Sequence, residues 1–197
     1  MKYFIVGLHS SGKQEVINQL EKMGVKCGKI FSNLETPTPD IYSSENFEYY
    51  DNTDINNIFE NNAYIFLQEL PHVTFNADKY YEGLSKYTYD ENDVFVLSPD
   101  QLIAIPPSHL EGDICFVWMD NTKSNRASRY RIEKRIYNFL ERDSYERRDI
   151  SSFVKTLYSY NAPILYFANE EPNRIATIIN TTIKYPETFD DFVKNFN

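Results

Sequence analysis

The feature that most constrains this chain is a glycine-rich loop between a short apolar segment and an amphipathic one. KYFIV (residues 2–6) is a continuous β-branched and aromatic run, typical of a buried central strand. The motif G-x-x-x-x-G-K then runs from Gly7 to Lys13, and apolar residues recur at helical spacing as far as Met23, with Gly24 as a stop. This context predicts a phosphate-binding loop, in which glycines turn backbone N–H groups inward and Lys13 bridges the outer phosphates. The residues expected to hold the nucleotide phosphates are Gly7, Ser10, Ser11, Gly12, Lys13 and Gln14.

Gln14 departs from the usual motif, which places a Ser or Thr after the lysine. That hydroxyl normally binds Mg²⁺ directly. A glutamine carbonyl can accept a hydrogen bond from a metal-bound water, but its oxygen lies further from the backbone. We therefore expect ATP with Mg²⁺ to bind here, the metal being held by nucleotide phosphates and water rather than by protein ligands. A working site and a site that binds without transfer are both compatible with this loop.

The remaining segments alternate between strand-like and helix-like patterns. Strands are predicted in residues 25–32, 63–70, 93–99, 113–119 and 162–169. A short helix is predicted at 54–60 with Asn52 or Thr53 as its cap, and the closing helix at 172–183. This alternation predicts an α/β fold with a five-stranded parallel sheet. The 197 residues fit a single domain, with a small acceptor lobe at about 33–92 and a lid at about 123–150.

Composition restricts the partners. The net charge of −9 and sequence pI of about 4.9 repel nucleic acid and anionic membranes, whereas a small phosphorylated ligand can still bind where positive charge is concentrated locally. Small-molecule nucleotides are the expected partners. No apolar run approaches a membrane span, the N-terminal segment turns polar too soon for a signal peptide, and Cys27 and Cys115 fit buried thiols in a reducing compartment. We expect a cytoplasmic protein. A monomer and a homodimer both remain open.

Positive charge is nevertheless concentrated late in the chain. The basic residues of this stretch are Lys123, Arg126, Arg129, Arg131, Lys134, Arg135, Arg142, Arg147 and Arg148. The segment is poor in core residues, which favours a mobile lid over phosphates, whereas the alternative is a salt-bridged helical surface. His9 is expected to point to solvent, and His72 and His109 are expected to be loop or core histidines.

Several further segments match, in the same order along the chain, the motifs of one known protein family. IFSNLETPTPD (residues 30–40) stands where an arginine on either side of two prolines would be expected. FEYYDNTDINNIFENNAYIFLQEL (47–70) is similar to a tyrosine-containing strand, a short helix and an F-[IL]-E strand. YYEGLSK (80–86) resembles Y-x-G-[TS] with one residue inserted, and DVFVLSPDQLIAIPP (93–107) resembles a buried strand that ends in Asp and Gln.

DICFVWMD (113–120), the arginine-rich segment 135–155 and ILYFANEEPNRIATII (164–179) continue this order as strand, lid, and final strand with Asn. Over most of its length the chain thus resembles the guanylate kinase family of nucleoside monophosphate kinases. The resemblance implies that Tyr49, Tyr81 and Ser85 contact the acceptor monophosphate, that Gln68 or Glu69 faces the base, and that Asp100 lies near the metal and acceptor. It also implies that Arg142 and Arg148 are catalytic lid arginines and that Asn169 lies near the adenine of ATP.

Two departures bear on the substrate. Glu35 and Thr38 stand where the family has arginines on the acceptor phosphate, and a carboxylate there repels a dianion. The acceptor is therefore expected to differ from guanylate, for example a deoxynucleotide or a modified one. Two alternatives remain: a catalytically silent guanylate-kinase-like binding module, and a P-loop kinase of another small phosphorylated acceptor.

Overall fold

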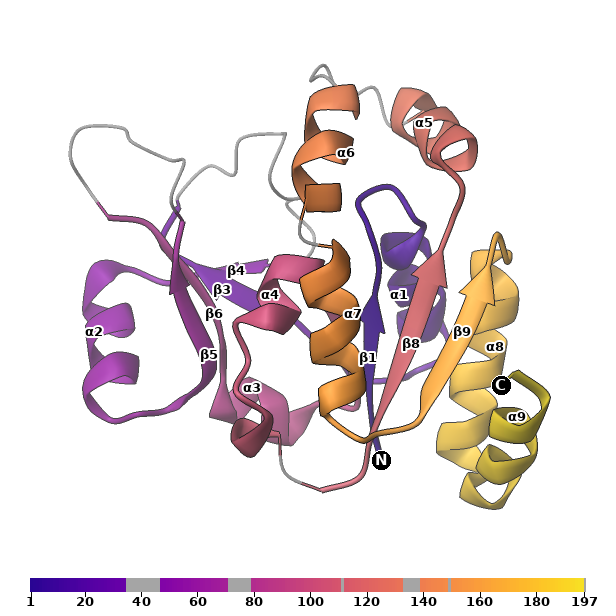
Figure 1. Cartoon of the computed structure of the whole chain (residues 1–197). Helices are drawn as coiled ribbons and strands as arrows, with labels where there is room; N and C mark the ends of the chain where they lie inside the picture. Colours follow the sequence, from indigo (N-terminus) through magenta and orange to yellow (C-terminus); the bar gives the residue numbers. More distant parts are fainter. Residues whose placement is uncertain (35–46, 71–78, 111, 133–138, 149, 197) are drawn as a thin grey trace.

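The computed structural model describes residues 1–34, 47–70, 79–110, 112–132, 139–148 and 150–196. Within them, parallel strands form a five-stranded sheet in the order β2-β7-β1-β8-β9 (Figure 1). Its strands are β1 (Lys2–Val6), β2 (Cys27–Gly28), β7 (Val94–Leu97), β8 (Ile114–Asp120) and β9 (Ile164–Ala168). The predicted α/β fold with a five-stranded parallel sheet is confirmed.

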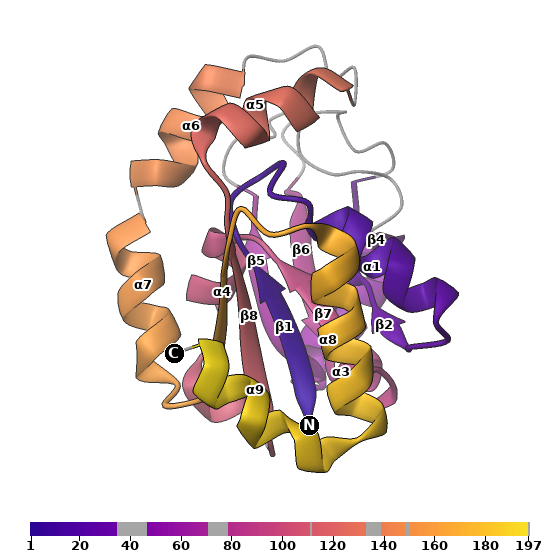
Figure 2. The ribbon, with the colours of Figure 1, turned by 90° about the vertical axis from the view of Figure 1, so that its right-hand side faces the viewer.

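Helices cover both faces of this sheet (Figure 2). On one face, α1 (Lys13–Lys22), α8 (Pro172–Lys184) and α9 (Phe189–Phe196) enclose a core that includes Tyr3 and Ile5. On the other, α4 (Pro99–Ile103) and α7 (Ile150–Ser159) enclose a core that includes Phe4 and Val6. Alternate residues of β1 thus enter opposite cores, which is why this strand is apolar throughout.

A second sheet lies beside the first and has the order β4-β3-β6-β5. Its strands are β3 (Ile30–Ser32), β4 (Phe47–Tyr49), β5 (Tyr64–Glu69) and β6 (Tyr81–Ser85), and α2 (Asn52–Glu60) lies outside it in Figure 1. The chain returns to the first sheet through α3 (Lys86–Glu91). The proposed limits of the acceptor lobe, 33–92, and of the lid, 123–150, stay predictions.

Two further helices, α5 (Lys123–Ile132) and α6 (Phe139–Arg148), stand above the carboxyl end of the first sheet (Figures 1 and 2). Short 3₁₀ turns occur at Pro107–His109 and Pro186–Thr188. No helix in the described ranges is long and apolar enough to span a membrane. Carboxyl ends of parallel strands are where α/β folds bind ligands, so α5 and α6 lie on the expected binding side.

Local details differ from the sequence predictions in three places. The segment 25–32 divides between the two sheets, as β2 and β3, instead of forming one strand. The cap of α2 is Asp51, not Asn52 or Thr53, because its carboxylate accepts the Asp54 N–H and the Asp54 carboxylate in turn accepts the Asp51 N–H. The predicted closing helix is followed by α9, whose apolar side packs on the core.

Candidate nucleotide site

The glycine-rich loop joins β1 to α1 in the arrangement that the sequence predicts. A Cβ on Gly7 would lie 2.5 Å from the Met119 carbonyl oxygen, so only glycine fits against β8 here. Ser10 (φ 53°) and Gly12 (φ 97°) have left-handed backbone conformations, which turn the chain sharply before α1 begins. Asn121 donates a side-chain hydrogen bond to the Ser11 carbonyl and so fixes the loop against the end of β8.

Lys13 lies over the same loop. Its Nζ donates to the Gly7 carbonyl at 2.7 Å and to the Leu8 carbonyl at 2.9 Å. The ammonium group is thereby held among backbone groups at the carboxyl end of β1. This is the place from which a lysine can reach the outer phosphates of a bound nucleotide.

Polar side-chain atoms in the loop are buried without a hydrogen-bond partner among the described residues. They include Ser10 Oγ, Ser11 Oγ and Gln14 Oε1. An unsatisfied buried polar atom costs about 1–3 kcal/mol, so three around one loop indicate groups arranged for a ligand. The hydroxyls fit phosphate oxygens, and the Gln14 carbonyl fits a water bound to Mg²⁺, since Gln14 Nε2 is already bonded to Asn18 at 2.7 Å. The loop therefore fits a nucleoside triphosphate with a hydrated metal ion.

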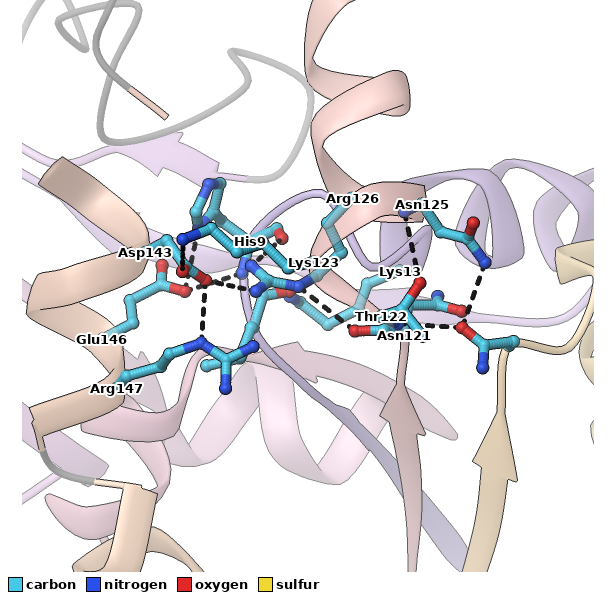
Figure 3. Close-up of polar contacts among 12 residues, drawn as sticks. His9, Lys13, Asn121, Thr122, Lys123, Asn125, Arg126, Asp143, Glu146 and Arg147 are labelled. Atoms are coloured by element: carbon cyan, nitrogen blue, oxygen red, sulfur yellow. Dashed lines mark hydrogen bonds and ion pairs between the residues drawn. The ribbon is translucent and has the colours of Figure 1, made fainter. Parts of the chain in front are cut away.

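A buried arginine on α5 joins the loop to α6 (Figure 3). Arg126 is 0% exposed; its guanidinium donates to the Asn121 carbonyl at 3.3 Å, to the His9 carbonyl at 3.4 Å and to the Asp143 carboxylate. Asp143 also accepts from Arg147 at 3.1 Å. Burial would raise the pKa of Asp143, but hydrogen bonds and positive charge from Arg126 and Arg147 hold it below its ordinary value.

Arg129 approaches the loop from the same face of α5, three residues further along. A Cβ on Gly12 would lie 2.8 Å from Arg129 Nη1 and 3.2 Å from Pro172 Cγ at the start of α8. Glu15 in the first turn of α1 holds the same guanidinium at 3.2 Å. Arg129 thus brings a positive charge to the N-terminus of α1.

His9 is buried, so the expectation that it points to solvent is wrong. Its backbone N–H donates to Glu146 Oε2 at 2.8 Å, and its ring Nδ1 lies 2.9 Å from the same oxygen. The ring also packs against Phe139, with centroids 5.1 Å apart. The helix α6 therefore contacts the loop through a carboxylate and an aromatic ring. The sequence analysis described this segment by its basic residues and did not predict that Glu146 contacts the loop.

The two proposed lid arginines both lie on α6. Arg148 is exposed at the end of this helix, and the side chain of Arg142 lies outside the described residues. Their catalytic role stays a prediction. Asn169 follows β9 and accepts hydrogen bonds from the Thr122 N–H at 2.8 Å and Asn125 Nδ2 at 3.0 Å. It ties β9 to the start of α5 at the carboxyl end of the sheet, and its contact with adenine also stays a prediction.

The second sheet contributes a buried polar cluster. Glu82 is 1% exposed, and its carboxylate accepts from Gln68 Nε2 and, at 3.0 Å, from Gln101 Nε2 at the start of α4. Burial, reinforced by the nearby Asp100 charge, raises the pKa of Glu82 to about 8, although the bond from Gln101 opposes the shift. The structure therefore brings Gln68 and Asp100 together around Glu82, a residue that the sequence analysis did not select.

Other predicted acceptor residues lie elsewhere on this sheet. Glu69 points to the opposite face from Gln68 and pairs with Lys79 at 3.0 Å, both side chains being well exposed. Tyr81 is half-buried opposite Glu69, and Tyr49 is half-exposed on β4. Ser85 lies at the other end of β6 from Tyr81, where its Oγ caps α3 by accepting the Thr88 N–H at 3.0 Å. The structure thus separates Ser85 from Tyr81 by the length of the strand.

Glu35, Thr38 and His72 lie outside the described residues. His109 ends the 3₁₀ turn Pro107–His109 and is partly buried, with Nδ1 2.9 Å from the Ile65 carbonyl oxygen. Sequence reasoning missed Arg126, Glu82 and Glu146. The spacing of Arg126 and Arg129, which places both on one helix face, was a signal available for Arg126. Glu82 occupies the variable position between Tyr81 and Gly83 of its motif, so the motif did not mark it.

No protein-family model matches the chain, and no curated protein matches its sequence. A guanylate kinase from Anaplasma phagocytophilum is structurally similar with a TM-score of 0.49 and 11% identity, covering 94% of this chain and 85% of that one. An unliganded sugar kinase from Janibacter sp. HTCC2649 is similar with a TM-score of 0.39 and 13% identity, covering 93% and 95%. Both TM-scores lie below 0.5, so function is inferred below from the chain's own residues.

Proposed function

We propose that this protein transfers a phosphoryl group from ATP to a nucleoside monophosphate. The observation that carries the proposal is the loop from Gly7 to Lys13. It combines a lysine at the carboxyl end of β1, a helix N-terminus and buried hydroxyls that have no hydrogen-bond partner in the described part of the chain. Each of these groups suits phosphate oxygens, and phosphoryl transfer needs positioning and charge neutralisation more than covalent chemistry.

Each part of the site has a role in this proposal. ATP bound with Mg²⁺ supplies the phosphoryl group. Lys13 and the loop hydroxyls would orient the phosphates, and Gln14 Oε1 would help to hold a hydrated Mg²⁺ ion. Arg129 adds positive charge beside Gly12, and Arg142 and Arg148 are the candidates for covering the transferred group. Excluding water from the closed site prevents ATP hydrolysis.

The acceptor is assigned to the side of the second sheet. Gln101 belongs to α4, which follows β7, and β7 is the direct neighbour of β1 in the first sheet. A ligand held near Gln68 and Asp100 would thus lie on the loop side of the molecule. The acceptor class within the monophosphates, including deoxy and modified forms, is part of this proposal, as is cytoplasmic action on free nucleotides.

One observation favours a second candidate, a silent binding module. The Glu146 carboxylate already accepts the His9 N–H of the loop, and a buried negative charge at this point disfavours a polyphosphate. In that case the loop would be a structural element closed by α6, and ATP would not bind.

The deciding experiment measures ATP consumption with Mg²⁺ across the common ribo- and deoxyribonucleoside monophosphates. We expect turnover with at least one acceptor in the wild type and none in Lys13→Ala. Lys22→Ala, an exposed lysine at the other end of α1, is the matched control and should keep wild-type turnover. Near wild-type turnover by Lys13→Ala would refute the mechanism. No turnover with ATP binding intact would indicate another acceptor. No turnover and no ATP binding would favour the silent module.

A further inference from the structure

One face of α6 lies on the phosphate loop (Figure 3). Phe139, Asp143 and Glu146 are four and three residues apart, which places them on the same side of this helix. The Asp143 and Glu146 side chains are only 3% and 7% exposed. Arg147 and Arg148, by contrast, are exposed. The helix therefore presents acidic and aromatic groups to the loop, rather than these two arginines.

The Glu146 carboxylate occupies a hydrogen-bond donor of the loop. Its Oε2 accepts the His9 backbone N–H at 2.8 Å and lies 2.9 Å from His9 Nδ1. Backbone N–H groups are what a loop of this kind offers to phosphate oxygens. A carboxylate oxygen is an anionic acceptor, as a phosphate oxygen is, so Glu146 makes the bond that a phosphate would make with this N–H.

This carboxylate lies at the part of the loop to which Lys13 is bonded. The Lys13 ammonium donates to the carbonyls of Gly7 and Leu8, and Leu8 directly precedes His9. A phosphate group held by Lys13 would therefore lie close to the carboxylate of Glu146. Two anionic groups side by side in a buried place repel each other strongly.

Other contacts hold α6 beside the loop without Glu146. Arg126 pairs with Asp143, and the Arg126 guanidinium carbon lies 5.5 Å from the centroid of the Phe139 ring. The same ring packs against His9, with centroids 5.1 Å apart. The charge of Glu146 can therefore be removed while these contacts keep the helix in place.

We propose that Glu146 is an autoinhibitory residue that competes with nucleotide phosphate for the loop. The proposal rests on the proposed function, because it requires that the loop bind a polyphosphate. The carboxylate and a phosphate need the same N–H and carry like charges, so they do not occupy the loop together. The nucleotide must displace Glu146 before it binds, and this competition lowers its apparent affinity.

Replacing Glu146 by glutamine tests the competition. Glu146→Gln removes the charge but keeps a carbonyl oxygen that can accept the His9 N–H, so its melting temperature should stay close to that of the wild type. Calorimetry then measures the binding of ATP with Mg²⁺ and of inorganic tripolyphosphate. We expect the variant to bind both at least about tenfold more tightly, because the like-charge repulsion is gone. Glu146→Ala, which removes the carboxylate altogether, should show the same direction of change.

Glu21→Gln is the matched control, because it makes the same change in net charge at an exposed position of α1 far from the loop. Solvent and salt screen a charge at that position, so its affinities should equal those of the wild type. Turnover gives a second readout. Competition acts on the free protein, so Glu146→Gln should lower the KM for ATP about tenfold and leave kcat unchanged.

The possible failures separate this inference from the proposed function. Equal or weaker phosphate binding in both Glu146 variants, or a changed kcat with an unchanged KM, would overturn the inference. Monophosphate-dependent ATP turnover in the wild type would still leave the proposed function intact in that case. No binding of ATP or tripolyphosphate by the wild type or by either variant would overturn both.

Discussion

Two carboxylates in this protein are similarly inaccessible to solvent, but their pKa values are shifted in opposite directions. The Asp143 side chain is 3% exposed and lies between Arg126, Arg147 and Lys123, and its pKa is lowered. Glu82 is 1% exposed and lies between two neutral amides, and its pKa is raised to about 8. Both side chains are almost inaccessible to solvent, but Glu82 is enclosed more deeply by protein atoms than Asp143, so deeper burial and the lack of a cationic partner together raise the pKa of Glu82, whereas the cationic partners of Asp143 lower its pKa.

The difference also separates two ways of building a site. Beside the phosphate loop, α5 and α6 are held by an ion pair that needs a full negative charge on Asp143. In the second sheet, amide hydrogen bonds orient side chains around a carboxyl group whose ionised form is disfavoured by burial. Three predictions test this distinction, in order of decreasing effect.

The largest effect is expected when Asp143 loses its charge. Asp143→Asn leaves the Arg126 guanidinium, which is 0% exposed, without its counter-ion. Removing one partner of a buried pair typically costs about 3–5 kcal/mol in the free energy of unfolding. Urea unfolding followed by the fluorescence of Trp118, the single tryptophan, measures this change.

Arg147→Met is the control for Asp143, because it removes a half-exposed partner and leaves Arg126 paired. It should cost less than about 1 kcal/mol. A loss of similar size in both variants would contradict the distinction. So would a change below about 1 kcal/mol in Asp143→Asn, because the buried arginine would then not depend on its carboxylate.

An intermediate effect is expected from the titration of Glu82. Its pKa is about 8 in the folded protein against an ordinary value of 4.5, so the folded state binds the proton more tightly. The resulting stability is fully present below about pH 4.5 and is lost as the pH rises through about 8, by up to about 1.4 kcal/mol per pH unit.

Glu82→Gln should remove this slope from unfolding free energies measured between about pH 5 and 9. Asp143 contributes in the opposite window, since its lowered pKa gives stability that is lost only as the pH falls below about 4. An unchanged slope in Glu82→Gln would mean that Glu82 is ionised throughout this range in the folded protein, and the contrast with Asp143 would fail.

The sequence predicted features whose residues are close together in the chain, but not contacts between residues that are far apart in it. The strand–loop–helix around Lys13 was predicted because its signals lie within about 20 consecutive residues. The ion pair of Arg126 with Asp143 and the bond of Glu82 to Gln101 join residues that are 17 and 19 positions apart on different elements. No local pattern marks such pairs. His9 was misplaced for the same reason, since its burial depends on Glu146, 137 positions away.

The cap of α2 shows a finer limit. Asp51, Asn52 and Thr53 are all good capping residues, and sequence preference alone does not rank them reliably. The reciprocal bond with Asp54 selects Asp51 in the structure. The sequence also could not decide between Gln68 and Glu69, because these two residues are adjacent in sequence but point to opposite faces of β5, and the strand register that distinguishes them is not visible in the sequence.

The smallest effect concerns a third kind of buried polar group, one with no partner. Ser11 is 0% exposed, and its Oγ has no hydrogen bond within the described residues, although a ligand phosphate can supply one. In Ser11→Ala the unsatisfied hydroxyl disappears, so the free protein should be unchanged or more stable by up to about 1 kcal/mol. The same variant should bind ATP with Mg²⁺ more weakly, by about tenfold, and show a correspondingly smaller rise in melting temperature with the nucleotide. Ser159→Ala, an exposed serine at the end of α7, should change neither quantity. A loss of stability in ligand-free Ser11→Ala would mean that the hydroxyl is already satisfied, and that this loop resembles the Glu82 cluster in pairing its own polar groups.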